Sequence, residues 1–398
     1  MAAEPESTPG RPAFRRTLFY VAGFDPERPS KYHALYREHA PPAAALSGAG
    51  VEVGALDRKS KLTQTWRVVW TGADGARTET EHVFLYWSDV VRAVWAPYGI
   101  GFLFAIWRAL AVCYASGLMR RLAREKSTFY FTMLLPAAIS TLYLALFALA
   151  IFGLGAAAAH LTRGLDWPWK LLAALPLLLV FTIVPIWRRI DERVHVAWLA
   201  RCVMAVVRPP QNVVAKYQDR AHAFGDLIVQ AAASDVDEVL VVGHSIGAQI
   251  AAQALGHASR ALSDEAKVSL LTLGSAIPVY AMTAPDPVFR RDLAALEAAT
   301  AIPWLDISSP GDAACSARLH PLAGAGLAEG ERPARRSPRF HAVLSPARWR
   351  AVRRNALDLH FQYLKSHDRS GGFDFFQLTA GPGRLSTKLN AAWPGGAA

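Results

Sequence analysis

One pentapeptide in this 398-residue chain has the residue types and spacing for nucleophilic chemistry: Gly-His-Ser-Ile-Gly at residues 243–247. The β-branched run at 239–242 predicts a strand buried on both faces, and the small residues at 248–255 predict a helix. A Gly-x-Ser-x-Gly sequence between a strand and a helix is typical of a nucleophile elbow, a tight turn that exposes the serine oxygen. We therefore expect Ser245 to be a nucleophile; the alternative is a tight turn whose serine only caps the helix.

The neighbours of Ser245 have expected structural roles. Gly243 and Gly247 flank a turn so tight that a side chain at either position would meet the adjacent strand or helix. His244 occupies the variable position of the motif, and we expect it to be structural rather than catalytic. The positive end of the following helix would point at Ser245, where negative charge develops during acyl transfer.

The rest of the chain alternates strands and helices, which predicts an α/β fold with a mostly parallel sheet. Ala-Asp-Gly at 73–75 separates two strands that should form a hairpin. Residues 324–338 are rich in Gly, Pro and Arg and should form an exposed loop, and the end beyond Pro382 should be disordered. Strands are expected at 17–24, 51–56, 65–70, 82–87, 239–242, 267–274 and 302–308, and helices at 31–46, 212–233 and 347–365.

Charge and cysteine content restrict the partners. The formal net charge is +11 and the pI is near 9.8, but most of the positive charge is arginine beside apolar segments. This pattern favours an anionic membrane surface and argues against nucleic acid. Cys113, Cys202 and Cys315 lack the spacing of a disulfide framework or a zinc site, so we expect no metal, no cofactor and a reducing compartment.

Two uncharged stretches predict a helical hairpin in the membrane, at residues 129–159 and about 170–187. The first is longer than the roughly 20 residues that a bilayer requires. Tryptophans at the ends of the second stand where an aromatic belt would lie. A pair of buried core helices is the alternative, but no other part of the chain could cover so much apolar surface.

Basic residues predict the orientation of this hairpin. Arginines and a lysine at 120–126 precede the first stretch, and three arginines at 188–193 follow the second, which places both ends in the cytoplasm. If one sheet contains strands from both sides of the hairpin, the chain must cross the membrane an even number of times. The apolar segment 93–119 is then an interfacial or re-entrant helix, with Arg108 reaching toward headgroups.

The pentapeptide and the order of strands around it resemble the α/β-hydrolase family. The resemblance covers roughly residues 15–90 and 200–370, with the membrane hairpin as an insertion. It implies a sheet with helices on both faces. The expected organisation is a disordered lead-in at 1–14, the first part of the hydrolase domain at 15–92, the interfacial segment and basic linker at 93–127, the hairpin at 128–190, the second part of the domain at 191–370 and a tail at 371–398.

The same resemblance implies an acid and a base for Ser245. The acid is expected on the loop after the second strand beyond the nucleophile strand, which makes Asp312 the candidate and Asp306, inside that strand, the alternative. The base is expected near the C-terminus. His360, in a His-x-x-Tyr arrangement, is the candidate, and His341 is the second choice. The alternative for His360 is a histidine packed at the surface of an amphipathic helix, because residues 349–364 read as helix, whereas the family usually sets this histidine on a loop.

Two backbone N–H groups are implied for the oxyanion hole, one from Ile246 and one from the loop at Gly23 and Phe24. These features together predict a membrane-anchored serine hydrolase that cleaves carboxylic, lipidic esters through an acyl-enzyme. An acyltransferase with the same triad and a catalytically silent, membrane-tethered scaffold are the alternatives. Acyl-ester or lipid substrates and the membrane are the expected partners.

Overall fold

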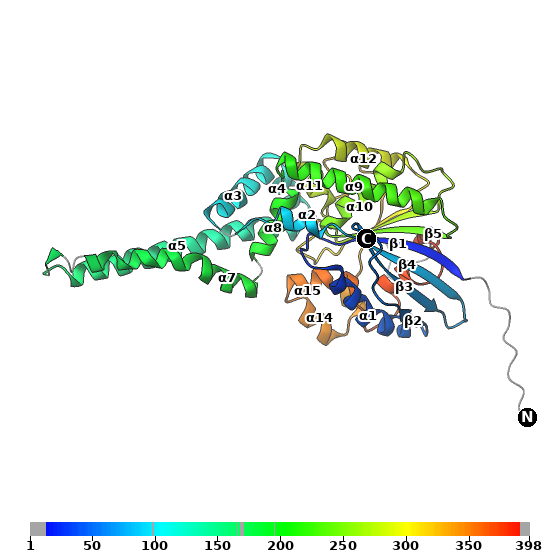
Figure 1. Cartoon of the computed structure of the whole chain (residues 1–398), viewed down its shortest axis with the longest axis horizontal. Coiled ribbons are helices and arrows are strands. Elements are labelled where there is room, and N and C mark those ends of the chain that lie inside the picture. The colour runs from blue at the N-terminus through cyan, green and yellow to red at the C-terminus, as the bar shows by residue number, and fades with distance from the viewer. Residues whose placement is uncertain (1–12, 98, 165, 168–170, 195, 391–398) are drawn as a thin grey trace, which may run out of the picture.

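A single eight-stranded sheet joins the two parts of the chain that flank the apolar segments (Figure 1). The computed structural model describes residues 13–97, 99–164, 166–167, 171–194 and 196–390. The strand order is β2-β3-β4-β1-β5-β6-β7-β8, and all neighbours are parallel except β2 with β3 and β3 with β4. The strands are β1 (Phe14–Val21), β2 (Gly50–Val53), β3 (Thr63–Thr71), β4 (Arg77–Leu85), β5 (Glu238–His244), β6 (Val268–Leu273), β7 (Trp304–Ile307) and β8 (Ala334–Arg336).

Helices cover both faces of this sheet, so the expected α/β architecture is confirmed at that level. Along β5, Val239 and Val241 face a core that includes residues of α9, α10 and α12, whereas Leu240 and Val242 face a core with α1 and the C-terminal helices. Apart from those of the apolar segments, the helices are α1 (Pro29–Leu46), α2 (Ser88–Ala93), α9 (Gln211–Ala232), α10 (Ile246–Ala258), α11 (Ile277–Thr283), α12 (Pro287–Ala298), α13 (Phe340–Val343), α14 (Pro346–Val352), α15 (Ala356–Phe361), η2 (Gln362–Leu364), α16 (Phe375–Thr379) and α17 (Leu385–Asn390).

Three expectations about the C-terminal half were wrong in detail. The expected exposed loop 324–338 contains the edge strand β8. The expected continuous helix 347–365 is divided into α14, α15 and η2, and Asn355 caps α15 by accepting hydrogen bonds from Leu357 and Asp358 N–H. The end beyond Pro382 was expected to be disordered, but α17 forms there, buries Leu385 and donates from Leu385 N–H to Glu238; residues 391–398 lie outside the described chain.

An arm of apolar helices projects from the sheet-bearing body (Figure 1). Its longest element, α5, buries residues only up to Ser140. The other 21 residues, 141–161, would extend about 32 Å at about 1.5 Å per residue. The helices of the apolar region are α3 (Ile100–Ala115), α4 (Leu118–Arg124), α5 (Phe129–Leu161), η1 (Leu171–Thr182), α7 (Ile183–Val194) and α8 (Val196–Val206).

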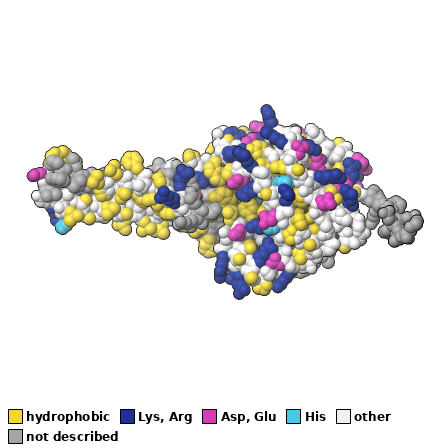
Figure 2. Space-filling model, turned by 60° about the horizontal axis from the view of Figure 1, so that its bottom comes forward, with side chains coloured by type: hydrophobic (Ala, Val, Ile, Leu, Met, Phe, Trp, Pro, Cys, Tyr) yellow, Lys and Arg dark blue, Asp and Glu magenta, His cyan; other side chains and the backbone are white. Residues whose placement is uncertain are grey.

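Among the described residues, α5 is the one helix that is long and apolar enough by itself to cross a membrane. Helices α3 and α4 pass the same test only as a pair bent by 67°, as in a broken span or a re-entrant loop. The second expected span, about 170–187, is η1 followed by α7 and not one continuous α-helix; residues 168–170 lie outside the described chain, as do residues 1–12 of the expected lead-in. Hydrophobic side chains dominate the surface of the arm (Figure 2).

The C-terminal tail closes the amino end of the sheet through one buried ion pair. Arg16 Nε lies 2.7 Å from Glu238 Oε2, and both side chains are inaccessible to solvent. Arg16 also donates to the carbonyls of Thr379, Gly381 and Gly383. Because Glu238 in turn accepts from Leu385 N–H, this pair fastens β1, β5 and the tail together.

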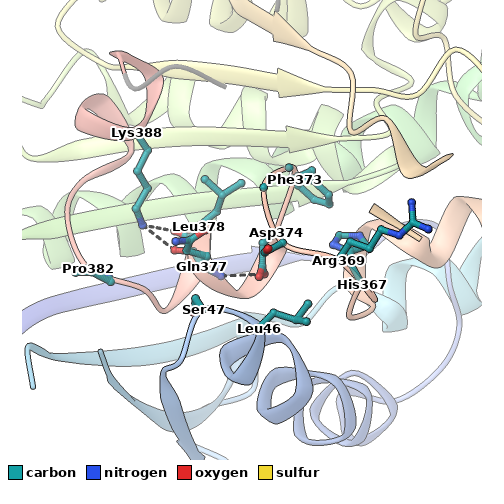
Figure 3. A pocket seen from close by; sticks show the side chains of 13 residues that line it. Leu46, Ser47, His367, Arg369, Phe373, Asp374, Gln377, Leu378, Pro382 and Lys388 are labelled. Carbon is teal, nitrogen blue, oxygen red and sulfur yellow. Dashed lines mark hydrogen bonds between the residues drawn. The ribbon is translucent and has the colours of Figure 1, made fainter. Parts of the chain in front are cut away.

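A cleft of about 450 Å³ lies beside this tail, and two of the charged side chains that line it hold the tail in place (Figure 3). Burial lowers the pKa of Lys388 well below its usual value, and its ammonium donates to the carbonyls of Gln377, Leu378 and Gly381. Asp374 caps α16 by accepting from the N–H groups of Phe376 and Gln377. Lys388 and Asp374 therefore hold the tail at this cleft.

We predict that Glu238→Gln destabilises the protein by about 3–5 kcal/mol, because it leaves the Arg16 guanidinium buried without a counter-charge. Thermal unfolding of the full chain in neutral detergent measures the effect. The matched control is Asp235→Asn, which removes an exposed partner of Arg15 and should leave the melting temperature unchanged. Equal melting temperatures for the two variants would contradict the structural role given to the buried pair.

Candidate functional site

Ser245 lies in a strained turn between β5 and α10. Its backbone has φ 58° and ψ −126°, and such left-handed strain in a residue other than glycine costs about 1–3 kcal/mol. The flanking glycines make the turn possible. A Cβ on Gly243 would lie 2.5 Å from Ala248 Cα, and a Cβ on Gly247 would lie 2.3 Å from the Ala22 carbonyl oxygen. The turn thus has the geometry expected of an elbow, with Ser245 half-buried at the carboxyl end of β5.

The loop after β1 passes directly beside this serine. A Cβ on Gly23 would lie 3.1 Å from Ser245 Cβ and 3.5 Å from Ser245 Oγ, so a side chain there would crowd the hydroxyl. The Phe24 ring is buried and stacks on Trp95 with 5.6 Å between centroids. Ile246 begins α10, so its N–H belongs to the first turn, whose N–H groups have no partner within a helix. The structure therefore brings Gly23 and Ile246 to Ser245.

Asp25, a buried residue of that loop, fixes the loop through hydrogen bonds to its carboxylate. Its carboxylate accepts hydrogen bonds from Lys31 Nζ at 3.0 Å, Tyr32 hydroxyl at 2.9 Å and Glu27 N–H at 3.0 Å. Trp87 Nε1 adds a bond of 2.9 Å to the carbonyl of Ala22. Two of these bonds come from α1, one from Glu27 within the loop and one from Trp87 between β4 and α2, so the loop is held from two neighbouring elements.

His360 and Asp312 form a buried hydrogen-bonded pair. His360 Nδ1 lies 2.8 Å from Asp312 Oδ2, and the side chains are 2% and 0% exposed. Since a carboxylate only accepts, Nδ1 carries the proton, and when the ring is neutral Nε2 keeps a lone pair. Burial would raise the pKa of Asp312, but the charge and hydrogen bond of His360, with the N–H of Ala314, outweigh it and lower the pKa.

Ser245 and His360 line the same small cavity. It has room of only about 20 Å³, and most of its other walls are apolar. Two elements of the apolar region form a large part of these walls. The cavity residues from α5 are Phe129 and Thr132, and those from α8 are Trp198, Leu199, Cys202, Val203 and Val206.

His244 positions the histidine of this pair. Burial, and after it the charge of His360, lower the pKa of His244 to about 3, so its ring is neutral at neutral pH. His244 Nε2 donates to the backbone carbonyl of His360 at 3.0 Å, and the two ring centroids are 4.8 Å apart. The structure is therefore consistent with the structural role expected for His244.

The two alternative residues lie elsewhere. Asp306 is buried in β7, where it accepts a 2.7 Å hydrogen bond from Thr272 Oγ1 and where burial raises its pKa. His341 is exposed on α13, with its ring centroid 6.2 Å from that of Trp349. Of the four residues weighed as acid or base, only Asp312 and His360 contact each other.

Sequence reasoning missed the supports of the acid loop. Tyr363 accepts a 2.7 Å hydrogen bond from Ser309 N–H, and Thr128 Oγ1 donates to the Pro310 carbonyl at 3.2 Å. Thr132 Oγ1 donates to the carbonyl of Ala313. The His-x-x-Tyr spacing was a usable signal for Tyr363, whereas hydroxyls at the start of an apolar helix carry no local sign of such a partner.

This arrangement can activate a hydroxyl. A lone pair on His360 Nε2 could take a proton from Ser245, and Asp312 would stabilise the imidazolium. In the described part of the chain, no group of three or more His, Cys, Asp or Glu residues could hold a metal ion.

We predict that Asp312→Asn slows labelling of Ser245 by a fluorophosphonate about 10³–10⁴-fold, because an amide neither fixes the tautomer of His360 nor stabilises its charge. The labelling rate is measured on the full chain in detergent. Asp306→Asn is the matched control, since it alters a buried carboxylate of β7 that lies off the pair, and its rate should stay within a few-fold of the original. Slow labelling of Asp306→Asn together with fast labelling of Asp312→Asn would show that Asp306, and not Asp312, is the acid.

Comparisons with known proteins leave the site as the basis for any functional argument. No family model matches the chain, and neither a curated protein nor a solved structure does. A fold alone would not define an activity in any case, since one fold hosts many chemistries.

Proposed function

We propose that this protein is a membrane-anchored serine hydrolase, similar to the α/β-hydrolase family, that cleaves carboxylic esters of lipids. The observation that carries the proposal is the buried His360–Asp312 hydrogen bond on the wall of the cavity that Ser245 lines. The strained backbone of Ser245 supports it, because strain in a residue other than glycine persists where the surrounding structure requires it, and often for function.

The mechanism follows from the hydrogen-bonded order of these groups. Ser245 Oγ attacks the ester carbonyl carbon while its proton passes to His360 Nε2, and the carbonyl oxygen becomes an oxyanion. The N–H of Ile246 and one from the loop at Gly23 and Phe24 donate to that oxyanion. Collapse expels the alcohol, which takes the proton from His360 and leaves an acyl-Ser245 ester. Water then repeats the sequence and releases the carboxylic acid.

The walls of the cavity favour a lipidic acyl group. Phe129 of α5 and several apolar residues of α8 line the same cavity as Ser245. At about 20 Å³ the cavity is too small for an acyl chain, so these walls must move apart to admit one, and the chain would then contact hydrocarbon rather than water. These walls belong to the base of the arm. An arm inserted in a bilayer would hold the site at the membrane surface, where lipid esters are concentrated.

The length of the arm suits this placement. The part of α5 beyond its last buried residue would extend about 32 Å, against about 30 Å for the hydrocarbon core of a bilayer. Large side chains along it are exposed, among them Leu146 at 57%, Leu149 at 65% and Phe152 at 75%. Such exposure over a whole helix is costly in water and expected in lipid.

Two crossings follow from the sheet if α5 spans the bilayer. Strands β4 and β5 precede and follow the apolar region and belong to one sheet, so the chain must return to the side from which it left. The segment formed by η1 and α7 lies beside α5, with the rings of Trp187 and Tyr143 4.8 Å apart. The positive residues of α4 and α7 then place the body and both termini on the cytoplasmic side.

We predict that Ser245→Ala abolishes both fluorophosphonate labelling and hydrolysis of a medium-chain p-nitrophenyl ester, because it removes the only atom that attacks. Labelled protein is measured on a gel and ester hydrolysis by absorbance. The control is Ser234→Ala, an exposed serine after α9, which should retain both. Labelling that survives in Ser245→Ala would end the proposal, and a wild-type protein that neither labels nor hydrolyses esters would favour the silent scaffold.

We predict opposite membrane sides for the tip of the arm and the body. Asp166→Cys lies between α5 and η1, whereas Asp74→Cys and Asp235→Cys lie at the exposed surface of the body. In sealed cells, an impermeant maleimide should label only Asp166→Cys, and the other two should label only after lysis. Protection of Asp166→Cys in intact cells, with labelling after lysis, would show that the arm does not cross.

A further inference from the structure

A basic cleft lies on the same edge of the sheet as Ser245. Its volume is about 690 Å³, within the usual range for ligand sites. Three separate segments form it: the loop from β1 into α1, the connection from β2 to β3, and the region from the end of β4 into α2. Since β1 and β4 are parallel and both end here, the cleft opens at the carboxyl edge of the sheet.

Each of these segments contributes a cation. Arg28, Arg58 and Lys61 line the cleft, and among the described residues none of them has a carboxylate partner. Arg92 lines it as well; it donates to the Pro26 carbonyl at 2.8 Å and to the Tyr86 hydroxyl, both uncharged acceptors. Glu27 is the one acidic residue among those that line it, so positive charge is in excess.

The N-terminus of α1 adds to this excess. The helix has 18 residues and begins in the cleft at Pro29, and no side chain caps it. Its first turn also lacks an acidic residue. Pro29 has no N–H group and Lys31 N–H donates to the Arg28 carbonyl at 3.0 Å, so it is the positive end of the helix dipole, rather than a row of free N–H groups, that would attract an anion to the point where Arg28 lies.

The geometry points to a binding site for a phosphate group, the headgroup of an anionic lipid or a soluble phosphate ester. Four cations from three segments suit a tetrahedral dianion, because guanidinium groups can each offer paired donors to its oxygens. All four side chains are exposed, so the cleft is accessible to a ligand from solvent or from a membrane surface. The place is also suitable for a lipid, since Arg92 lies on α2, just before the apolar region, and Pro26 follows the loop that passes Ser245.

The test measures binding on the full chain in neutral detergent, in the Ser245→Ala background, so that its result does not depend on catalysis. Calorimetric titrations use three probes: sn-glycerol 3-phosphate, dioctanoyl phosphatidic acid, and dioctanoylglycerol as the phosphate-free lipid. We expect Arg58→Gln/Lys61→Gln to weaken phosphatidic acid binding roughly 30-fold, about fivefold for each cation removed. The matched control is Arg37→Gln/Arg369→Gln, which removes two exposed charges outside the cleft and should bind as the parent does.

Each outcome decides the inference or the source of the phosphate. Weakening with both phosphate probes identifies the phosphate itself as the ligand, and weakening with phosphatidic acid alone identifies a lipid headgroup. The inference is overturned if the parent protein binds neither phosphate probe, if dioctanoylglycerol binds as well as phosphatidic acid, or if the control variant loses as much affinity as the cleft variant.

Discussion

The close contact between the start of α10 and the end of β1 determines the geometry of the whole site. Gly247 lies so near the backbone that a Cβ would meet the carbonyl oxygens of Val21 at 2.4 Å and of Ala22 at 2.3 Å. This packing forces Ser245 into a positive φ and brings Gly23 against its side chain. The same contact fixes β1 beside β5. Only glycine at position 247 lets α10 pack this closely against the end of β1. The position of Ser245, of the N–H groups proposed for the oxyanion and of the loop that Asp25 supports all depend on that packing.

The apolar region is part of the site as well as a candidate anchor. Thr128 and Thr132, at the start of α5, donate to carbonyls of the loop that carries Asp312, and α8 covers the serine. The acid loop is thus held by Tyr363 on the body side and by α5 on the arm side. If the arm lies in a bilayer, the position of Asp312 depends on a helix whose other end is surrounded by lipid. This arrangement gives a physical reason for an insertion between β4 and β5 rather than at a terminus.

Sequence patterns predicted the fold and the site where local chemistry is decisive. The strand before Ser245 could be predicted because every residue of β5 is buried, which selects an unbroken β-branched sequence. The glycines on either side of Ser245 indicated the tight turn. The sequence predicted a continuous helix through His360 because only Arg353, Arg354 and Asn355 separate α14 from α15. The cap that starts α15 is a local contact of the Asn355 side chain with Leu357 and Asp358 N–H, which the helical pattern does not reveal. Strand β8, Ala-Arg-Arg, shows no alternation, since its place is given by pairing with β7 alone. The composition of residues 171–182 predicted an apolar helical segment, but it did not predict that the segment would be the 3-10 helix η1.

The loop from Ala22 to Arg28 runs from the Ser245 site to the basic cleft, so one short segment contributes to both proposed sites. Gly23 touches Ser245, Asp25 is anchored by Lys31 and Tyr32 of α1, and Arg28 stands at the N-terminus of that same helix in the basic cleft. A phosphate in the cleft would attract the positive end of α1 and the cations around it, and α1 holds the Asp25 carboxylate that fixes the loop. Such a ligand would influence Ser245 only by shifting the backbone of the loop at residues 22–28. In the proposed arrangement the cleft would bind the phosphate of a lipid headgroup or of a soluble ester, and the proposed bond-making chemistry would stay with Ser245, His360 and Asp312.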